Sequence, residues 1–291
     1  VSTAKAYNDG AWHHVVTSLS AAGMVLWVDG IKAGEDTSVT SGQDYTGYWR
    51  VGGDNLGGWP NTGSSNYFNG TIDDVAIYPT VLTRTQVRDH FTKSGRTLDI
   101  PTPPSDAYGT EVVADDPTLF WRLNETGGAT TARDANGNLQ DGTYYNDPQQ
   151  GQPSDVVAGD AAAGFDGTND LVSTNASFTN PTVFSLEAWF NTTTGSGGKI
   201  IGFGRAASGN SSSYDRHVYM SPDGRLNFGT YNGSLNIATS PASYNDGAWH
   251  QAVATMGPGG MALYVDGVLV ATNPNTVPEN YTGYWRVGGD N

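Results

Sequence analysis

Oxygen-bearing side chains alternate along the segment that runs from Asp134 through Asn136 to Asn138. A loop that binds a hard cation such as calcium presents carboxylate and amide oxygens at this spacing. The segment lacks the glycine at the sixth position and the glutamate at the twelfth position of an EF-hand loop, so it is not that motif. Asp and Asn also form ordinary turns. The spacing therefore makes Asp134, Asn136 and Asn138 candidate calcium ligands, with turn formation as the alternative.

Hydrolytic chemistry needs other constellations of residues. Neither an HExxH zinc motif nor a GxSxG nucleophile motif occurs in the sequence. The absence of cysteine excludes disulfides, thiolate zinc sites and thiol catalysis. His13 and His250 each follow a tryptophan, and we expect their rings to bond neighbouring backbone groups. These observations predict a protein that is not an enzyme.

Exposed aromatic side chains favour a binding function. Ligand sites combine aromatic faces with a few precisely placed polar groups, and sugars suit such surfaces. Five aromatic residues in or near expected loops are candidate ligand contacts: Trp59, Tyr45, Tyr48, Tyr214 and Tyr231. The remaining tryptophans lie in strand-like patterns, and we expect them in the core: Trp12, Trp27, Trp49, Trp121, Trp189, Trp249 and Trp285.

The charge balance excludes one class of partner and permits another. The formal net charge is −15, from 29 acidic and 14 basic residues. Such a surface repels nucleic-acid phosphates but is compatible with calcium. No stretch approaches 18 continuous apolar residues, so we expect no membrane insertion.

Apolar alternation predicts β-strands as the elements that position these residues. One face of the segment 184–190 carries apolar residues at a period of two, namely Phe184, Leu186, Ala188 and Phe190. Glu187 and Trp189 lie on the other face. Residues 217–231 and 249–272 each predict a hairpin around a turn that contains proline and glycine. Only residues 83–95 have a helical pattern. The fold class that follows is all-β, a two-sheet antiparallel sandwich.

Three segments of the first hundred residues recur near the end of the chain. The pairs are 7–14 with 244–251, 23–30 with 260–267, and 45–55 with 281–291. This repeat predicts three parts: residues 1–95 as the C-terminal part of a first unit, 96–106 as a proline-rich linker, and 107–291 as the N-terminal four-fifths of a second unit. Residues 56–95 have no counterpart in the second unit. We expect them to fill, in the same or a neighbouring chain, the place of its closing strand.

The order of several segments resembles laminin-G-like, concanavalin A-like jelly-roll domains of large bacterial surface and secreted proteins. The segments are 116–128, 142–146, 162–172, 184–192, 246–255 and 263–267, and 68–87 in the first unit. The resemblance implies a jelly-roll sandwich, often with calcium at its rim, in an extracellular or cell-surface protein. It also implies that Asp166, Asp73 and Asp74 lie in segments that contribute to such a metal site.

Sandwich glucanases similar to these domains carry a Glu-x-Asp-x-x-Glu run on one strand, and the corresponding strand here offers only Glu187. The resemblance therefore favours a non-catalytic extracellular module for adhesion or for binding carbohydrate or a surface protein. Two alternatives remain. The repeats are spacers or filament subunits that contact neighbouring repeats head to tail, or the chain is an accessory domain of a larger secreted glycoside hydrolase.

Overall fold

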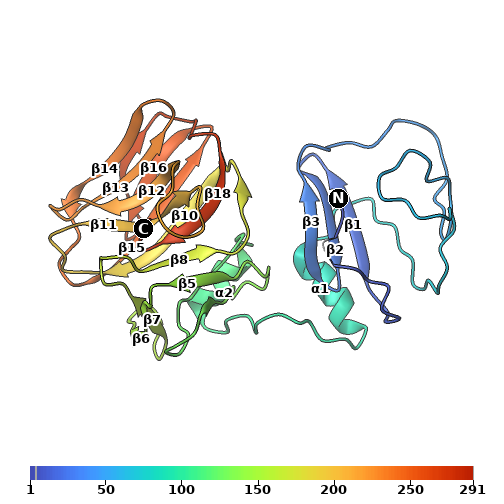
Figure 1. The fold of residues 1–291 in the computed structure, drawn as a ribbon, viewed down its shortest axis with the longest axis horizontal. Coiled ribbons are helices and arrows are strands. Elements are labelled where there is room, and N and C mark those ends of the chain that lie inside the picture. Colours follow the sequence, from blue (N-terminus) through green and yellow to red (C-terminus); the bar gives the residue numbers. More distant parts are fainter. Residues whose placement is uncertain (4, 291) are drawn as a thin grey trace. The chain divides into compact units, whose positions relative to one another are not determined.

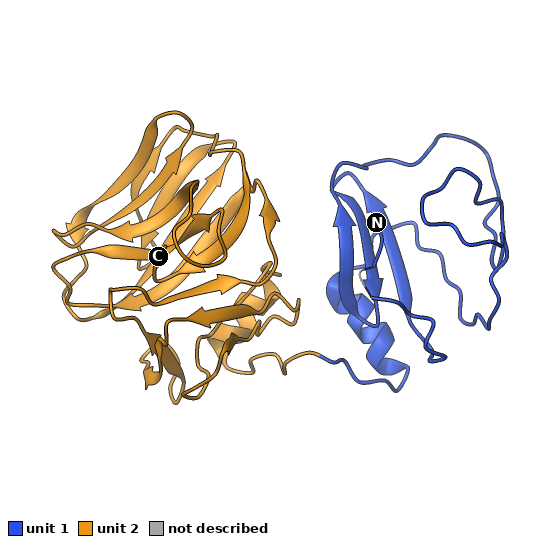
Figure 2. Cartoon of the chain, viewed as in Figure 1, with its two compact units in different colours: residues 1–99 blue, residues 100–291 orange. Residues whose placement is uncertain are grey.

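The computed structural model describes residues 1–3 and 5–290. The chain divides into two compact units, residues 1–99 and 100–291 (Figure 2). The division falls within the segment 96–106 that was expected to be a linker. Within the described residues no helix is long and apolar enough to cross a membrane.

Unit 1 contains one small antiparallel sheet and one helix (Figure 1). The elements are β1 (Val15–Ser20), β2 (Gly23–Val28), β3 (Ile31–Asp36) and α1 (Arg84–Lys93). Between β3 and α1 the backbone is irregular, and its β-pairing in the described chain is a single bridge between Gly53 and Tyr67. Residues 68–80, within the segment 56–95 that was expected to replace the closing strand of the second unit, belong to no strand. That expectation therefore stays a prediction.

Helix α1 forms where the sequence predicted it and covers one face of the small sheet. The Thr83 side chain caps the helix in a reciprocal capping box, which satisfies backbone N–H groups at the helix start. Phe91 is buried and stacks on His14, with ring centroids 6.2 Å apart. The Arg88 Nε donates to the Gly30 carbonyl at 3.3 Å. The helix therefore packs beside the turn that joins β2 and β3.

Unit 2 is a sandwich of a four-stranded and a nine-stranded antiparallel sheet. The smaller sheet has the order β10-β15-β16-β17, and the larger has the order β14-β13-β12-β11-β18-β8-β5-β4, with β9 also paired to β18. The elements of unit 2 are α2 (Ala107–Ala114), β4 (Thr131–Ala132), β5 (Gly142–Tyr145), β6 (Gln149–Pro153), β7 (Ala161–Gly164), β8 (Leu171–Thr174), β9 (Phe178–Thr179), β10 (Phe184–Asn191), β11 (Gly198–Gly204), β12 (Tyr214–Met220), β13 (Arg225–Tyr231), β14 (Leu235–Ser243), β15 (Trp249–Gly257), β16 (Gly260–Val265), β17 (Val268–Asn273) and β18 (Thr282–Val287).

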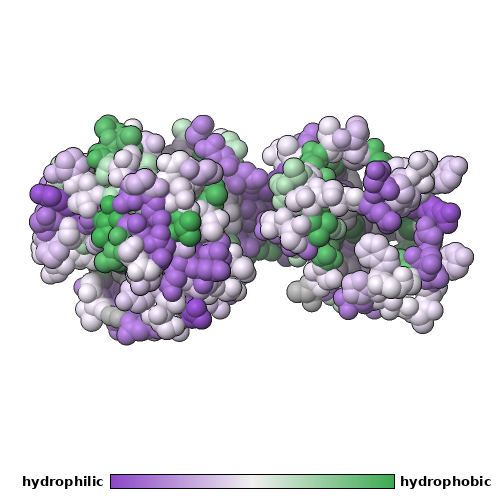
Figure 3. Space-filling model, turned by 90° about the horizontal axis from the view of Figure 1, so that it is seen from above, coloured by the Kyte–Doolittle hydropathy of each residue, from purple (hydrophilic) through white to green (hydrophobic). Residues whose placement is uncertain are grey.

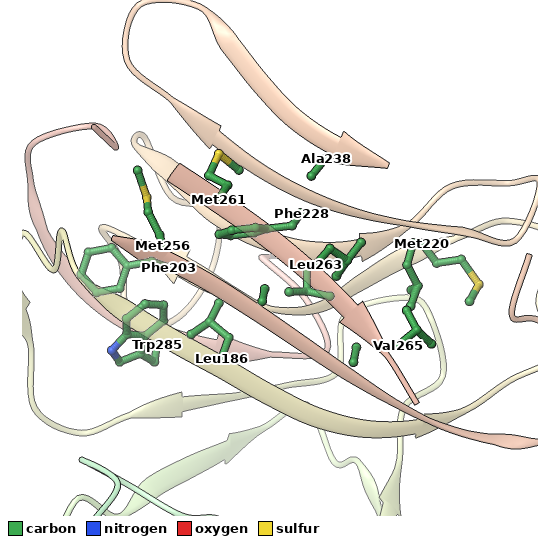
Figure 4. Packing of buried hydrophobic residues seen from close by; sticks show 14 of the residues in the cluster. Leu186, Phe203, Met220, Phe228, Ala238, Met256, Met261, Leu263, Val265 and Trp285 are labelled. Carbon is green, nitrogen blue, oxygen red and sulfur yellow. The ribbon is translucent and has the colours of Figure 1, made fainter. Parts of the chain in front are cut away.

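The core lies between the facing sides of the two sheets (Figure 4). Leu186 and Leu263 enter it from the smaller sheet, and Phe203, Phe228 and Trp285 enter it from the larger. Burial of each such side chain stabilises the fold by about 1.5–3 kcal/mol relative to exposure. The predicted two-sheet antiparallel sandwich is therefore confirmed. So are the hairpins β12–β13 and β15–β16.

Two expectations about local structure were wrong. Helix α2 was not expected, and it begins where the Asp106 carboxylate accepts a hydrogen bond from the Gly109 N–H. Three tryptophans expected in the core, Trp12, Trp49 and Trp189, are exposed. Trp12 and Trp49 lie outside strands in unit 1, and Trp189 points outward because it alternates with the core residues of β10.

Candidate functional site

The larger sheet of unit 2 has one polar face. On β12, Val218 and Met220 enter the core, so His217 and Tyr219 project from the opposite face. The same alternation on β13 places Asn227 on that outward face. We define the polar face by six residues: Lys199, His217, Tyr219, Asn227, Arg286 and Asp290.

An ion-pair cluster holds the centre of the polar face. The Asp290 carboxylate lies 2.9 Å from the Lys199 Nζ and 2.8 Å from the Arg286 Nη1. The Arg286 side chain is fully buried, and it also donates to the carbonyls of Ala206 and Gly209, each at 2.9 Å. Burial opposes ionisation of Asp290, but the Lys199 ammonium and the Arg286 guanidinium outweigh it and lower the pKa of the carboxyl. Asp290 is therefore a fixed anion.

A neutral histidine lies beside this cluster. Burial and the neighbouring Lys199 charge lower the pKa of His217 to about 3. Its ring passes over Gly202, where a Cβ would collide with the imidazole. A glycine is therefore needed at this position of β11.

Tyr219 supplies a neutral hydrogen-bonding group to the polar face, whereas Asn227 is buried. Tyr219 is half-buried, and burial raises the pKa of its phenol, so the hydroxyl stays protonated. The Asn227 Oδ1 accepts from the Thr239 Oγ1 at 2.7 Å. Asn227 and Arg286 are buried, and the partly exposed residues of the face are Lys199, His217, Tyr219 and Asp290. Their ammonium, imidazole, hydroxyl and carboxylate groups suit a ligand that is rich in hydroxyls.

Sequence reasoning missed every residue of the polar face. The available signal was alternation: Arg286 follows Trp285, which was expected in the core, so it had to project from the other side. That the face is continuous depends on β18 lying between β11 and β8, and strand order cannot be read from a sequence of this kind.

A second polar site is built around Arg122. Its guanidinium pairs with Asp106 at 2.7 Å and with Asp160, beside a pocket of about 420 Å³ that Asn124 also lines. Burial opposes ionisation of Asp160, but its hydrogen bonds to Arg122 and Asn124 outweigh it and lower its pKa. Because these side chains bond one another, the cluster ties the start of α2 to the sandwich.

The predicted calcium ligands of the 134–138 loop are engaged in hydrogen bonds of the protein. Asp134 is buried, and its carboxylate accepts from the backbone N–H groups of Phe120, at 3.0 Å, and Gln140, at 3.1 Å. The amides of Asn136 and Asn138 both donate to one backbone carbonyl. These hydrogen bonds fit a turn better than a metal site.

The other predicted calcium ligands lie apart from that loop. Asp166 accepts from the Thr168 N–H at 2.8 Å within its own turn. Asp73 and Asp74 are exposed residues of unit 1. In the described part of the chain no three His, Asp or Glu side chains gather as metal ligands. Calcium binding stays a prediction that these residues do not favour.

The five predicted aromatic contacts do not form one platform. Trp59, Tyr45 and Tyr48 are exposed in the irregular segment of unit 1, and Tyr214 and Tyr231 are exposed at the ends of β12 and β13. Figure 3 shows hydrophobic and hydrophilic residues interspersed on the visible face of each unit. The exposure of the five aromatic side chains permits ligand contact, but their roles as ligand contacts stay predictions.

Both predicted backbone-bonding histidines contact carboxylates instead. The His13 Nδ1 lies 2.7 Å from Asp29, and its Nε2 lies 3.0 Å from Asp9. In unit 2 the His250 Nδ1 lies 2.8 Å from Asp266, and its Nε2 lies 3.2 Å from Asp246, which corresponds to Asp9. We call this arrangement the histidine clamp. In each unit the clamp joins the histidine near the start of β1 or β15 to the Asp-Gly turn that follows β2 or β16.

Comparisons with known proteins agree with this architecture. A laminin-G-like family model, described as "Concanavalin A-like lectin/glucanases superfamily", matches residues 1–88 and 165–291. No curated protein matches the chain.

Several solved structures are similar at low identity. A heptameric SAP-like pentraxin from Limulus polyphemus is 17% identical with a TM-score of 0.33, covering 42% of this chain and 58% of its own. The carbohydrate binding module CBM66 from Bacillus subtilis is 14% identical with a TM-score of 0.31, covering 50% and 87%. The Bacillus licheniformis β-glucanase is 11% identical with a TM-score of 0.30, covering 60% and 76%. The chain thus spans little more than half of the pentraxin's length.

Proposed function

The chain belongs to the concanavalin A-like lectin/glucanases superfamily, and we propose that it is a non-catalytic extracellular module that binds carbohydrate. The observation that carries the proposal is the polar face of the larger sheet. Lys199 pairs with Asp290, and Tyr219 lies opposite Lys199 on the neighbouring strand, so charged and neutral hydrogen-bonding groups follow one another across the sheet in an arrangement suited to sugar hydroxyls.

The chemistry of the carboxylates supports binding without catalysis. Glycoside hydrolysis needs a protonated carboxylic acid and a second carboxylate that faces it across the bond. Asp290 is the one carboxylate of the polar face as defined, and its two ion pairs keep it ionised. Glu187 projects from the smaller sheet, where its Oε1 accepts from the Tyr108 hydroxyl at 2.9 Å and the Gln251 amide at 2.8 Å.

The setting of such a module follows from its composition. The net charge of −15 and the absence of cysteine suit an acidic exported protein of bacteria, with carbohydrate or a cell-surface protein as the partner. Adhesion would then result from binding by more than one repeat on the same chain.

Glycan-array screening of the full chain, followed by calorimetry on each hit, tests the proposal. We expect Tyr219→Ala to weaken binding at least tenfold, because it removes a ring and a hydroxyl from the face. Tyr264→Ala is the matched control, since Tyr264 projects from the outward side of the smaller sheet, and it should leave affinity unchanged. Equal losses in both variants, or no binding across broad glycan panels, would contradict the proposal, as would release of reducing sugar.

A further inference from the structure

One row of the polar face contains buried polar atoms that lack hydrogen-bond partners within the described chain. Strands β8, β18, β11 and β12 are consecutive in the larger sheet (Figure 1). Ser173 on β8 lies opposite Arg286 on β18. Arg286 in turn lies opposite Gly202 on β11, and the His217 imidazole of β12 passes over that glycine. Because opposed residues of neighbouring strands project from the same face, Ser173, Arg286 and His217 form one row.

The bonds of the Arg286 side chain are all made by one nitrogen. Its Nη1 has four acceptors, namely the carbonyls of Ala206 and Gly209, the Ser211 hydroxyl and the Asp290 carboxylate. Neither Nε nor Nη2 has a hydrogen-bond partner among the described residues, although the side chain is fully buried. The N–H groups of Nε and Nη2 form one edge of the planar guanidinium, and such an edge matches the two oxygens of a carboxylate. Arg286 therefore keeps a carboxylate-binding edge free.

Two further polar atoms of the row are unpaired in the same way. The Ser173 Oγ and the His217 Nδ1 are buried, and the described part of the chain offers neither of them a hydrogen-bond partner. A hydroxyl donates one hydrogen bond, and a neutral imidazole donates from one of its two nitrogens. The large majority of buried polar groups in proteins are hydrogen-bonded. The gathering of such atoms around one guanidinium therefore indicates a site for a polar ligand group.

The charge of the neighbouring groups favours an anion. Lys199 and Arg286 carry two positive charges and Asp290 carries one negative charge, so the three sum to +1 in a chain with a net charge of −15. A buried cation that is not fully compensated is costly, and one carboxylate would neutralise the cluster. The Lys199 side chain is 11% exposed and lies over Gly202 beside the imidazole. It is therefore the group that a ligand displaces to reach the guanidinium.

We propose that the free edge of Arg286 binds a carboxylate, and that this carboxylate belongs to a uronic acid of an acidic glycan. The sugar assignment rests on the proposed carbohydrate-binding function, whereas carboxylate binding does not. Ser173 and His217 donate to the same carboxylate, and the hydroxyls of the sugar contact the partly exposed Lys199 and Tyr219. A free carboxylate presents the same two oxygens, so the experiments separate the two sources.

Nuclear magnetic resonance of the Arg286 side chain in the isotope-labelled full chain tests carboxylate binding directly. The probes are glucuronate, acetate and glucose at equal ionic strength, which supply a sugar with a carboxylate, a carboxylate alone and a sugar alone. We expect glucuronate and acetate to shift the Nε–H resonance and glucose to leave it unchanged. Glucuronate should bind at least about tenfold more tightly than acetate, because its hydroxyls add bonds to the face. No shift with either anion would overturn the carboxylate site, and equal affinities would overturn the sugar assignment.

Calorimetry with matched glycans tests the same assignment on longer ligands. Each uronate-containing hit from the glycan array is compared with its carboxyl-reduced form, which keeps the sugar and loses the charge. We expect reduction to weaken binding by about tenfold or more, and Ser173→Ala to weaken binding of the acidic form alone by a similar factor. Arg286→Lys keeps the charge but loses the paired N–H groups, so it should also abolish the preference for the acidic form.

The serine variant keeps this test decisive if Arg286→Lys does not fold, because Ser173→Ala removes only an unpaired hydroxyl. Ser185→Ala is the matched control, since Ser185 is an exposed residue of β10 on the smaller sheet, and it should change neither affinity. Hits that are all neutral, or equal affinity for acidic and reduced forms, would overturn the acidic-sugar assignment and leave carbohydrate binding intact. An array without any hit would instead contradict the proposed function, and the Arg286 resonance would still decide the carboxylate site.

Discussion

The three-stranded sheet β1–β2–β3 of unit 1 and the sheet β15–β16–β17 of unit 2 have the same register. Val15 lies opposite Val28, and the corresponding residues Ala252 and Val265 lie opposite each other. The second hairpin of each sheet carries its irregularity at the same place, after Leu26 in unit 1 and after the matching leucine in unit 2. The histidine clamp is also present in both. Strand pairing, turn and clamp therefore form from local sequence.

The two sheets differ in which face is covered. In unit 2 the larger sheet covers the face that contains Ala252 and Met256, and both are buried. In unit 1 the same face contains Val15 and Leu19, which are 59% and 42% exposed. In unit 1 Phe91 of α1 packs against His14 on the opposite face, and Val28, which lies opposite Val15, is 5% exposed. Burial is thus decided by the partner element and not by the hairpin.

Truncating one aligned apolar position in each unit is the largest expected effect. Met256→Ala should destabilise unit 2 by about 2–5 kcal/mol, because it removes a buried side chain and leaves a cavity. The aligned change Leu19→Ala is the control and should cost no more than about 0.5 kcal/mol, since Leu19 is exposed. Urea unfolding measures both. Equal losses would show that the face of unit 1 is covered in solution.

The histidine clamp predicts a smaller, pH-dependent effect. Burial alone would lower the pKa of His250, but hydrogen bonds to Asp266 and Asp246 outweigh it and raise the pKa above 6.5. The stabilisation is therefore fully present below pH 6.5 and is lost as the pH rises through the folded-state pKa. We expect the difference in melting temperature between the native chain and His250→Asn to shrink from pH 6 to pH 9.

His13 provides the matched test in unit 1. Hydrogen bonds to Asp29 and Asp9 raise its pKa, so His13→Asn should show the same sign of pH dependence. The comparison must be between variant and native chain at each pH, because burial lowers the pKa of His14 and His217, whose contributions run the other way. A difference that grows with pH would refute the clamp as a source of stability.

The two Asp-Gly turns predict the smallest effect. Gly30 and Gly267 have φ values of 77° and 78°, so alanine at either position costs on the order of 1 kcal/mol in backbone strain. A Cβ on Gly30 would also collide with the Leu98 side chain, whereas a Cβ on Gly267 meets nothing. Gly30→Ala should therefore be the more destabilising change by thermal melting. Equal losses would mean that Leu98 yields without cost.

Local patterns predicted much of the fold and little of the candidate site. The alternation in β10, the Gly-containing turns and the capped helix α1 were all readable, because each depends on residues close in sequence. Helix α2 was missed because its start depends on Asp106, whose second oxygen is engaged by Arg122. The polar face was missed because Lys199 and Arg286 are far apart in sequence and meet only when β11 pairs with β18.

The repeated segment 45–55 shows where local information ends. Its sequence alone determines the ion pair between Arg50 and Asp54, which recurs between Arg286 and Asp290 in unit 2. Whether those eleven residues become a buried central strand or an exposed irregular segment depends on neighbouring strands that supply backbone partners and an apolar surface. Only the tertiary structure provides them, because hydrogen bonds and burial in a sheet come from strands distant in the chain.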